Sequence, residues 1–105
     1  MTPGEIADDI KHASSMGFAA FKMRVGVQAM DKDLKRIEAA RLSMPSGDLM
    51  VDAIMGTINP PWQLNQAIDF ENFCAPFNLT WIEEPLSPAN LQGMSELTSK
   101  SDTPI

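Results

Sequence analysis

The stretch Leu49-Met50-Val51-Asp52-Ala53-Ile54 is the strongest indication of the fold, because it is almost entirely apolar and carries a single acidic side chain near its end. A short run of this kind is typical of a β-strand that is covered on both faces. Similar stretches lie on either side of it, at residues 18–25 and 79–83, and both carry charged side chains near their ends. The sequence therefore predicts strands with polar residues at their carboxyl ends.

Helix signals alternate with these strands. Thr2 can cap a first helix, with Pro3 at its first position, Glu5 completing a capping box and Gly17 ending it. Residues 103–105 look like the start of a further strand. The remaining helices are expected from Asp31 to the break at residues 45–47, from Asn59 to Pro76, and from Pro88 to Ser99.

The second expected helix divides into two sides. Its apolar residues Leu34, Ile37 and Ala40 share one face and should pack inward. The basic side chains are expected outside this face, namely Lys32, Lys35, Arg36 and Arg41.

The polar strand ends recur with a nearly constant period. Asp52 lies 30 residues after Lys22, and Glu83 lies 31 residues after Asp52. A β-α repeat of this kind predicts a parallel sheet with right-handed crossovers. Two α/β architectures fit, an open doubly wound sheet or a (β/α)₈ TIM-type barrel. A complete barrel takes about 250 residues, so in the second case residues 1–105 form a single partial domain of about three to four β-α units.

Composition argues against several classes of function. A net charge of −6 disfavours nucleic acid, because phosphate binding needs clustered basic residues. No apolar run approaches the ~20 residues of a membrane helix, and the first residues lack signal-peptide features, so we expect a cytoplasmic protein. His12 is the only histidine, which leaves no triad or zinc site within this chain. Cys74, the single cysteine, is expected to be a buried small hydrophobe.

Strand alternation places four charged residues on one side of the sheet. Successive strand residues point to opposite faces, so Lys22 and Arg24 share a face, and Glu83 and Glu84 do not. If the apolar residues beside them lie under the helices, Lys22, Arg24, Asp52 and Glu83 all converge on the other side. Mg²⁺ prefers a shell of oxygen ligands that includes carboxylates, and the two cations would neutralise an anionic substrate.

Each of these residues also has a simpler interpretation when it is taken alone. An aspartate at a strand end, such as Asp52, is often a turn residue. Glu83 and Glu84 could belong to a solvated loop, and Lys22 and Arg24 could be charges that protect a sheet edge from pairing. Their joint recurrence at one end of three strands is what favours a site.

Three motifs resemble one known family. Residues 17–26 (GFAAFKMRVG), 49–53 (LMVDA) and 81–86 (WIEEPL) are closely similar, in order and spacing, to the mandelate racemase and muconate lactonizing group of the enolase superfamily. The resemblance covers essentially the whole chain. It implies the first half of an enolase-type catalytic barrel, without the N-terminal capping domain and the second half of the barrel that family members carry.

The resemblance also implies a chemistry. In that family Mg²⁺ stabilises the enediolate formed when a base removes the proton α to a carboxylate. By resemblance, Asp52 is the first metal ligand, Glu83 the second, and a third lies just past Ile105. The expected function is a lyase or isomerase, such as an acid-sugar dehydratase or a 2-hydroxy acid racemase, and the expected assembly is a homo-oligomer.

Two positions depart from the family pattern. The family often has Lys-x-Lys at the first motif, with the second lysine as the base, and this chain has Arg24 there. Arginine stays protonated and is a poor base, but it can hold a carboxylate with two hydrogen bonds. Lys22 is then left as the base if its surroundings favour the neutral amine; otherwise a histidine from outside this chain would serve. Ile54 stands where the family often has asparagine.

Two other interpretations remain open at this point. The chain could be a truncated, non-catalytic half-barrel that self-associates through its open edges and apolar interior. It could also be a small doubly wound domain that binds an anionic ligand at its strand ends.

Overall fold

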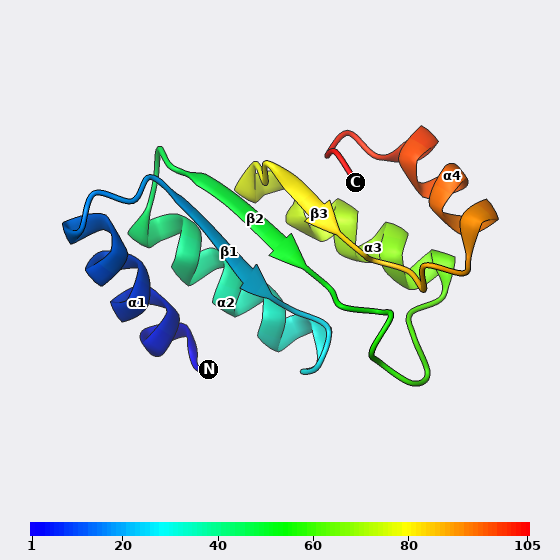
Figure 1. The fold of residues 1–105 in the computed structure, drawn as a ribbon, viewed down its shortest axis with the longest axis horizontal. Coiled ribbons are helices and arrows are strands. Elements are labelled where there is room, and N and C mark those ends of the chain that lie inside the picture. The colour runs from blue at the N-terminus through cyan, green and yellow to red at the C-terminus, as the bar shows by residue number, and fades with distance from the viewer.

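Three parallel strands form the central sheet of the computed structural model, which describes residues 1–105 (Figure 1). The strands are β1 (Ala20–Arg24), β2 (Asp48–Asp52) and β3 (Trp81–Glu83), and they lie side by side in chain order. Arg24 is paired in register with Asp52, and Asp52 with Glu83. The carboxyl ends of the strands therefore meet at one edge of the sheet.

The helices alternate with the strands, as predicted. They are α1 (Pro3–Ser15), α2 (Met30–Ser43), α3 (Leu64–Cys74) and α4 (Leu91–Lys100), and the short 3₁₀ helix η1 (Ala75–Phe77) follows α3. Figure 1 shows α1, α2 and α3 on one side of the sheet. This one-sided cover rules out the doubly wound sheet, which needs helices on both faces. None of the helices has the length and apolar character needed to cross a bilayer.

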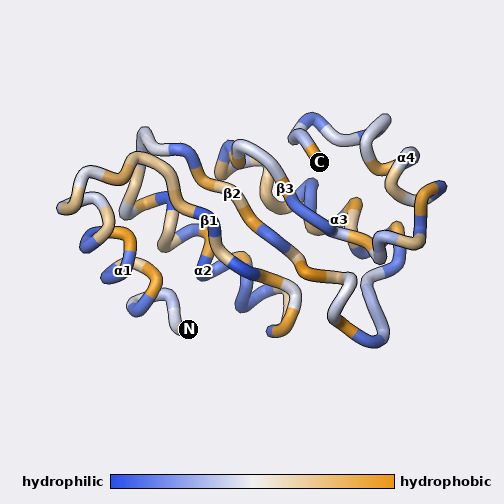
Figure 2. The backbone as a smooth tube through the Cα atoms, viewed as in Figure 1, coloured by the Kyte–Doolittle hydropathy of each residue, from blue (hydrophilic) through white to orange (hydrophobic).

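The hydrophobic core lies between the sheet and these helices. Met23, Val51 and Ile82 point toward the helices and are 4%, 0% and 1% exposed. They pack in one cluster with helix residues that include Ile37 and Phe70. The charged ends of the strands show as hydrophilic segments in Figure 2. The apolar strand residues therefore lie under the helices. This is the arrangement that was needed for Lys22, Arg24, Asp52 and Glu83 to share the opposite face of the sheet.

Local signals at the first helix are confirmed. The backbone N–H of Thr2 donates to Glu5 Oε2 at 2.9 Å, and the backbone N–H of Glu5 donates to Thr2 Oγ1 at 3.2 Å. Gly17 takes a left-handed φ of 92° just after the helix. Cys74 is buried, and burial raises the pKa of its thiol to about 12.

Several predicted boundaries are wrong. The strands are shorter than predicted, and residues 103–105 form no strand, although the carbonyl oxygen of Pro104 accepts a hydrogen bond from the N–H of Ile82 at 2.9 Å. The third helix begins at Leu64 and not at Asn59. Residues that precede a proline disfavour helical geometry, so the two consecutive prolines, at positions 60 and 61, belong to the preceding loop.

Two arginines predicted outside the apolar face of the second helix are engaged inside the structure. Arg36 is only 8% exposed and its Nη1 donates to Asp33 Oδ1 at 2.9 Å. Arg41 donates hydrogen bonds to four backbone carbonyl oxygens, those of Met44, Gly47, Phe77 and Asn78. A helical pattern shows which side a residue occupies, but it does not show that acceptors from loops reach that side.

Candidate metal centre

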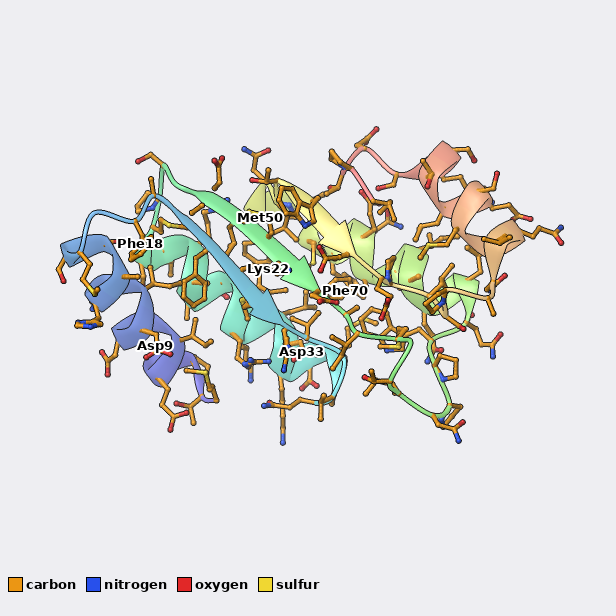
Figure 3. All side chains as sticks on the ribbon, in the orientation of Figure 1. Asp9, Phe18, Lys22, Asp33, Met50 and Phe70 are labelled. Atoms are coloured by element: carbon orange, nitrogen blue, oxygen red, sulfur yellow. The ribbon has the colours of Figure 1, made fainter.

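The carboxyl ends of the three strands bring the four candidate residues to one face. Arg24, Asp52 and Glu83 are paired across the three strands in a single row, and Lys22 lies two residues before Arg24 on β1. Side chains of paired residues point to the same face of a sheet. Figure 3 shows Lys22 and Met50 on the sheet, with the helices behind it.

Lys22 connects the outer strands of the sheet. Its Nζ lies 3.0 Å from Glu83 Oε2, so the side chain passes over β2 to form an ion pair and a hydrogen bond. The two side chains are 46% and 42% exposed. Exposed ion pairs add little stability, so this contact is easily exchanged for a contact to another partner.

The Asp52 carboxyl lies in an environment that disfavours its charge. Burial raises its pKa, and the neighbouring Glu83 raises it further, whereas the Ile54 N–H, which donates to Asp52 Oδ1 at 2.9 Å, and Lys22 act in the opposite direction. The pKa of Glu83 is lowered, first through its hydrogen bond with Lys22. A cation shared by the two carboxyl groups would stabilise the ionised form of both.

The structure places Glu83, and not Glu84, beside Asp52. Glu84 has a positive φ of 49°, and its Oε2 accepts a hydrogen bond from the backbone N–H of Gly56 at 3.0 Å. Its carboxylate therefore fastens the loop after β2 to the end of β3. This placement agrees with the strand alternation expected from the sequence.

Arg24 is the one candidate residue whose side chain makes no hydrogen bond or ion pair. It is exposed at the end of β1, in the same row as Asp52. Its guanidinium group is always charged and can bind a carboxylate through two parallel hydrogen bonds. The side chain is therefore available to an anionic ligand that approaches the row.

The donor set fits Mg²⁺ in kind but is incomplete in number. Asp52 and Glu83 offer carboxylate oxygens, which Mg²⁺ prefers. The chain contains no group of three or more His, Cys, Asp or Glu side chains that could hold a metal ion. A metal ion here would take its other oxygen ligands from water, substrate or residues outside this chain.

Sequence reasoning missed the left-handed residues beside both acids. Ile54, two residues after Asp52, has φ 48°, and Glu84, directly after Glu83, has φ 49°. A left-handed conformation costs a residue such as isoleucine about 1–2 kcal/mol, and strain of this kind concentrates at functional sites. The asparagine that the resembling family often has at position 54 was the available signal, because asparagine tolerates this conformation.

The chain is similar to several known proteins. The model of the enolase C-terminal domain-like family matches residues 5–105. The L-talarate/galactarate dehydratase of Salmonella typhimurium is 37% identical over 92 residues, which are 85% of this chain and 21% of that protein.

Two solved structures share the fold over almost the whole chain. A racemase from Streptomyces coelicolor A3(2) with bound magnesium has a TM-score of 0.87 and 33% identity, and the L-talarate dehydratase from Polaromonas sp. JS666, complexed with Mg and L-glucarate, has a TM-score of 0.86 and 28% identity. Each match covers 98% of this chain and 28% of the other. The chain thus spans between a fifth and a third of the length of these relatives.

Proposed function

The chain belongs to the enolase C-terminal domain-like family, in the mandelate racemase and muconate lactonizing group of the enolase superfamily, and on this premise we propose that its strand ends help to remove the proton α to a substrate carboxylate. Its fold is part of a (β/α)₈ barrel, as predicted. The relatives include a dehydratase and a racemase. The reaction class proposed for this chain is therefore that of a Mg²⁺-dependent lyase or isomerase.

Asp52 and Glu83 are the proposed metal ligands. The observation that carries the proposal is their register, because adjacent strands present the two carboxylates side by side on the face that the helices leave uncovered. When bound, Mg²⁺ supplies positive charge that offsets the negative charge developing on the substrate carboxylate. Ile54 contributes by donating its backbone N–H to Asp52 Oδ1, which fixes the orientation of that carboxylate.

Lys22 and Arg24 are the proposed substrate and catalytic residues. Lys22 Nζ lies on the same face as the two acids and is held only by an exposed contact to Glu83, so it can turn toward a substrate. As the ammonium it can donate a proton, and it can accept one at Nζ only after it has left Glu83 and lost its own proton to solvent. Arg24 stays protonated and is proposed to bind the substrate carboxylate from the end of β1.

The proposed substrate is a small carboxylate, either a sugar acid or a 2-hydroxy acid. The named dehydratases act on, or were solved with, talarate, galactarate or glucarate, which are sugar acids. These anions suit a row that offers two cationic side chains. Mg²⁺ is the proposed cofactor on the same grounds, since both structural relatives hold magnesium.

We also propose that residues 1–105 form one partial domain, the first half of the barrel. A groove of ≈ 530 Å³ lies between β3 and α4, lined in part by Trp81, Met94 and Ile105. The N–H of Ile82 already donates to the carbonyl oxygen of Pro104 along this edge. A further parallel strand would occupy the groove and complete the pairing of β3.

A non-catalytic half-barrel that self-associates is the second candidate. The uncovered sheet face carries Trp81, which is 38% exposed, and the open edge of β3 offers backbone groups to a second copy. Sedimentation of the chain, combined with the α-proton exchange assay described below, distinguishes the two candidates. A stable homo-oligomer without metal-dependent chemistry would favour this second one.

The test of the proposed function is exchange of the α-proton with solvent. Because residues 1–105 alone are expected to be inactive, galactarate or glucarate is incubated in D₂O with Mg²⁺ and the protein that carries the completed barrel, and the loss of the α-proton signal is followed by NMR. We expect Asp52→Asn and Glu83→Gln to abolish exchange, whereas Asp69→Asn and Glu96→Gln, which change acids away from the site, leave it intact. Unchanged exchange in either site variant would remove that residue from the metal centre.

A further inference from the structure

A cavity of ≈ 370 Å³, lined mostly by polar residues, lies where α1 and α2 begin. Figure 1 shows the first residues of both helices at the same end of the molecule. The cavity is separate from the row that contains Asp52 and Glu83. The polar residues that line it include Thr2 and Glu5 from the start of α1, and Gln28, Lys32, Lys35 and Arg36 from the start of α2 and the loop before it.

Arg36 is an incompletely paired cation at this cavity. Its side chain is 10% exposed, and its only hydrogen bond runs from Nη1 to Asp33 Oδ1. The other oxygen of Asp33, Oδ2, accepts from the backbone N–H of Gly26 at 2.8 Å, so both of its oxygens are engaged. Arg36 Nε is buried without any partner. A buried N–H without an acceptor is costly, and its edge of the guanidinium fits two oxygens of a carboxylate or phosphate.

The lysines at the cavity have no acidic partners. The only two ion pairs in the chain join Lys22 to Glu83 and Arg36 to Asp33, so Lys32 and Lys35 are unpaired. The one acidic residue in the lining, Glu5, already accepts a hydrogen bond from the backbone of Thr2. This positive local charge contrasts with the net charge of −6 for the whole chain.

The ends of two helices add to the positive potential. Residues at the N-termini of α1, with 13 residues, and α2, with 14, line or adjoin the cavity. Helix N-termini carry a partial positive charge, which favours bound anions. The unpaired guanidinium edge, the two lysines and the helix ends therefore act in the same direction.

We propose that this cavity binds a small oxoanion, with the incompletely paired guanidinium of Arg36 and the ammonium groups of Lys32 and Lys35 supplying the positive charge. The site is independent of the proposed α-proton chemistry. A carboxylate and a phosphate both fit this site, because each presents negatively charged oxygens, in a planar group for the carboxylate and a tetrahedral group for the phosphate. Whichever of the two groups binds more tightly is assigned as the ligand.

The experiment is an NMR titration of the ¹⁵N-labelled 105-residue chain with sodium phosphate and, separately, with sodium acetate at low ionic strength. We expect the Nε–H signal of Arg36 to shift and to saturate. Tighter binding of phosphate assigns the site to a phosphate group, and tighter binding of acetate assigns it to a carboxylate. Shifts that sodium chloride reproduces equally at the same ionic strength would overturn the proposal.

Variants separate the site from general surface charge. The double change Lys32→Gln with Lys35→Gln leaves the core untouched and should weaken binding about fivefold, because each exposed ionic contact is weak on its own. Arg36→Lys keeps the charge but removes the planar edge, and it should eliminate saturable binding. The matched control is Lys11→Gln with Lys100→Gln, which changes two exposed lysines elsewhere. Equal weakening in the control and the cavity pair would refute the assignment.

Discussion

Replacing Gly26 by alanine tests how tightly the end of β1 is held against the end of β2. Gly26 has φ 98°, and a Cβ atom added there would lie 2.6 Å from the carbonyl oxygen of Ala53. That oxygen belongs to the residue directly after Asp52, so the clash falls on the strand end that carries the candidate ligand. Backbone strain costs about 1–2 kcal/mol, and overpacking against a rigid neighbour costs about 1–3 kcal/mol more.

Gly17 provides the matched control, because it has a similar φ of 92° and nothing lies within 4 Å of an added Cβ. Gly17→Ala should therefore carry the backbone cost alone, about 1–2 kcal/mol. Urea unfolding followed by circular dichroism gives the free energy of unfolding of both variants. We expect Gly26→Ala to lose clearly more stability than Gly17→Ala. Equal losses would show that the ends of β1 and β2 are not in close contact.

Two further predictions concern charged residues. Folding raises the pKa of Asp52 above its ordinary 3.8, so the ionised carboxylate lowers the stability of the fold at neutral pH. Asp52→Asn should therefore raise the free energy of unfolding at pH 7. This gain should shrink as the pH falls toward 3.8, and urea unfolding at both pH values measures it. Arg41→Met should lower the free energy of unfolding by about 2–4 kcal/mol, because four carbonyl oxygens lose a charged donor. Lys35→Met is the control for this variant. An equally small change in the free energy of unfolding of both variants would show that the hydrogen bonds of Arg41 do not stabilise the fold.

The row of site residues was predictable because strand geometry is regular. Side chains alternate with a period of two, and parallel strands all end at the same edge. The position of Asp52 and Glu83 near the end of each apolar run was therefore enough to place them together. The same regularity correctly separated Glu83 from Glu84.

Other features depend on contacts that the sequence pattern does not contain. Arg36 and Arg41 read as outward charges on a helix, yet Arg36 is buried against Asp33 of the same helix, and Arg41 also reaches the carbonyl groups of Phe77 and Asn78, which are distant in the sequence. The left-handed backbone of Ile54 could not be predicted from its residue type, because isoleucine normally avoids that conformation. The consecutive prolines before α3 favour a helix start in the sequence, although proline is equally suited to the loop that precedes a helix.

Metal binding by the paired carboxylates of Asp52 and Glu83 can be observed by adding Mn²⁺, which prefers the same oxygen ligands as Mg²⁺, and recording which amide signals of the ¹⁵N-labelled chain are broadened. The paired carboxylates predict that signals at residues 52–54 and 83–84 broaden first, and that the combination of Asp52→Asn and Glu83→Gln removes the effect. Because the chain carries 14 acidic residues, a competing surface site is a real alternative. Broadening centred on Asp8 and Asp9, and unchanged in the double variant, would contradict the account.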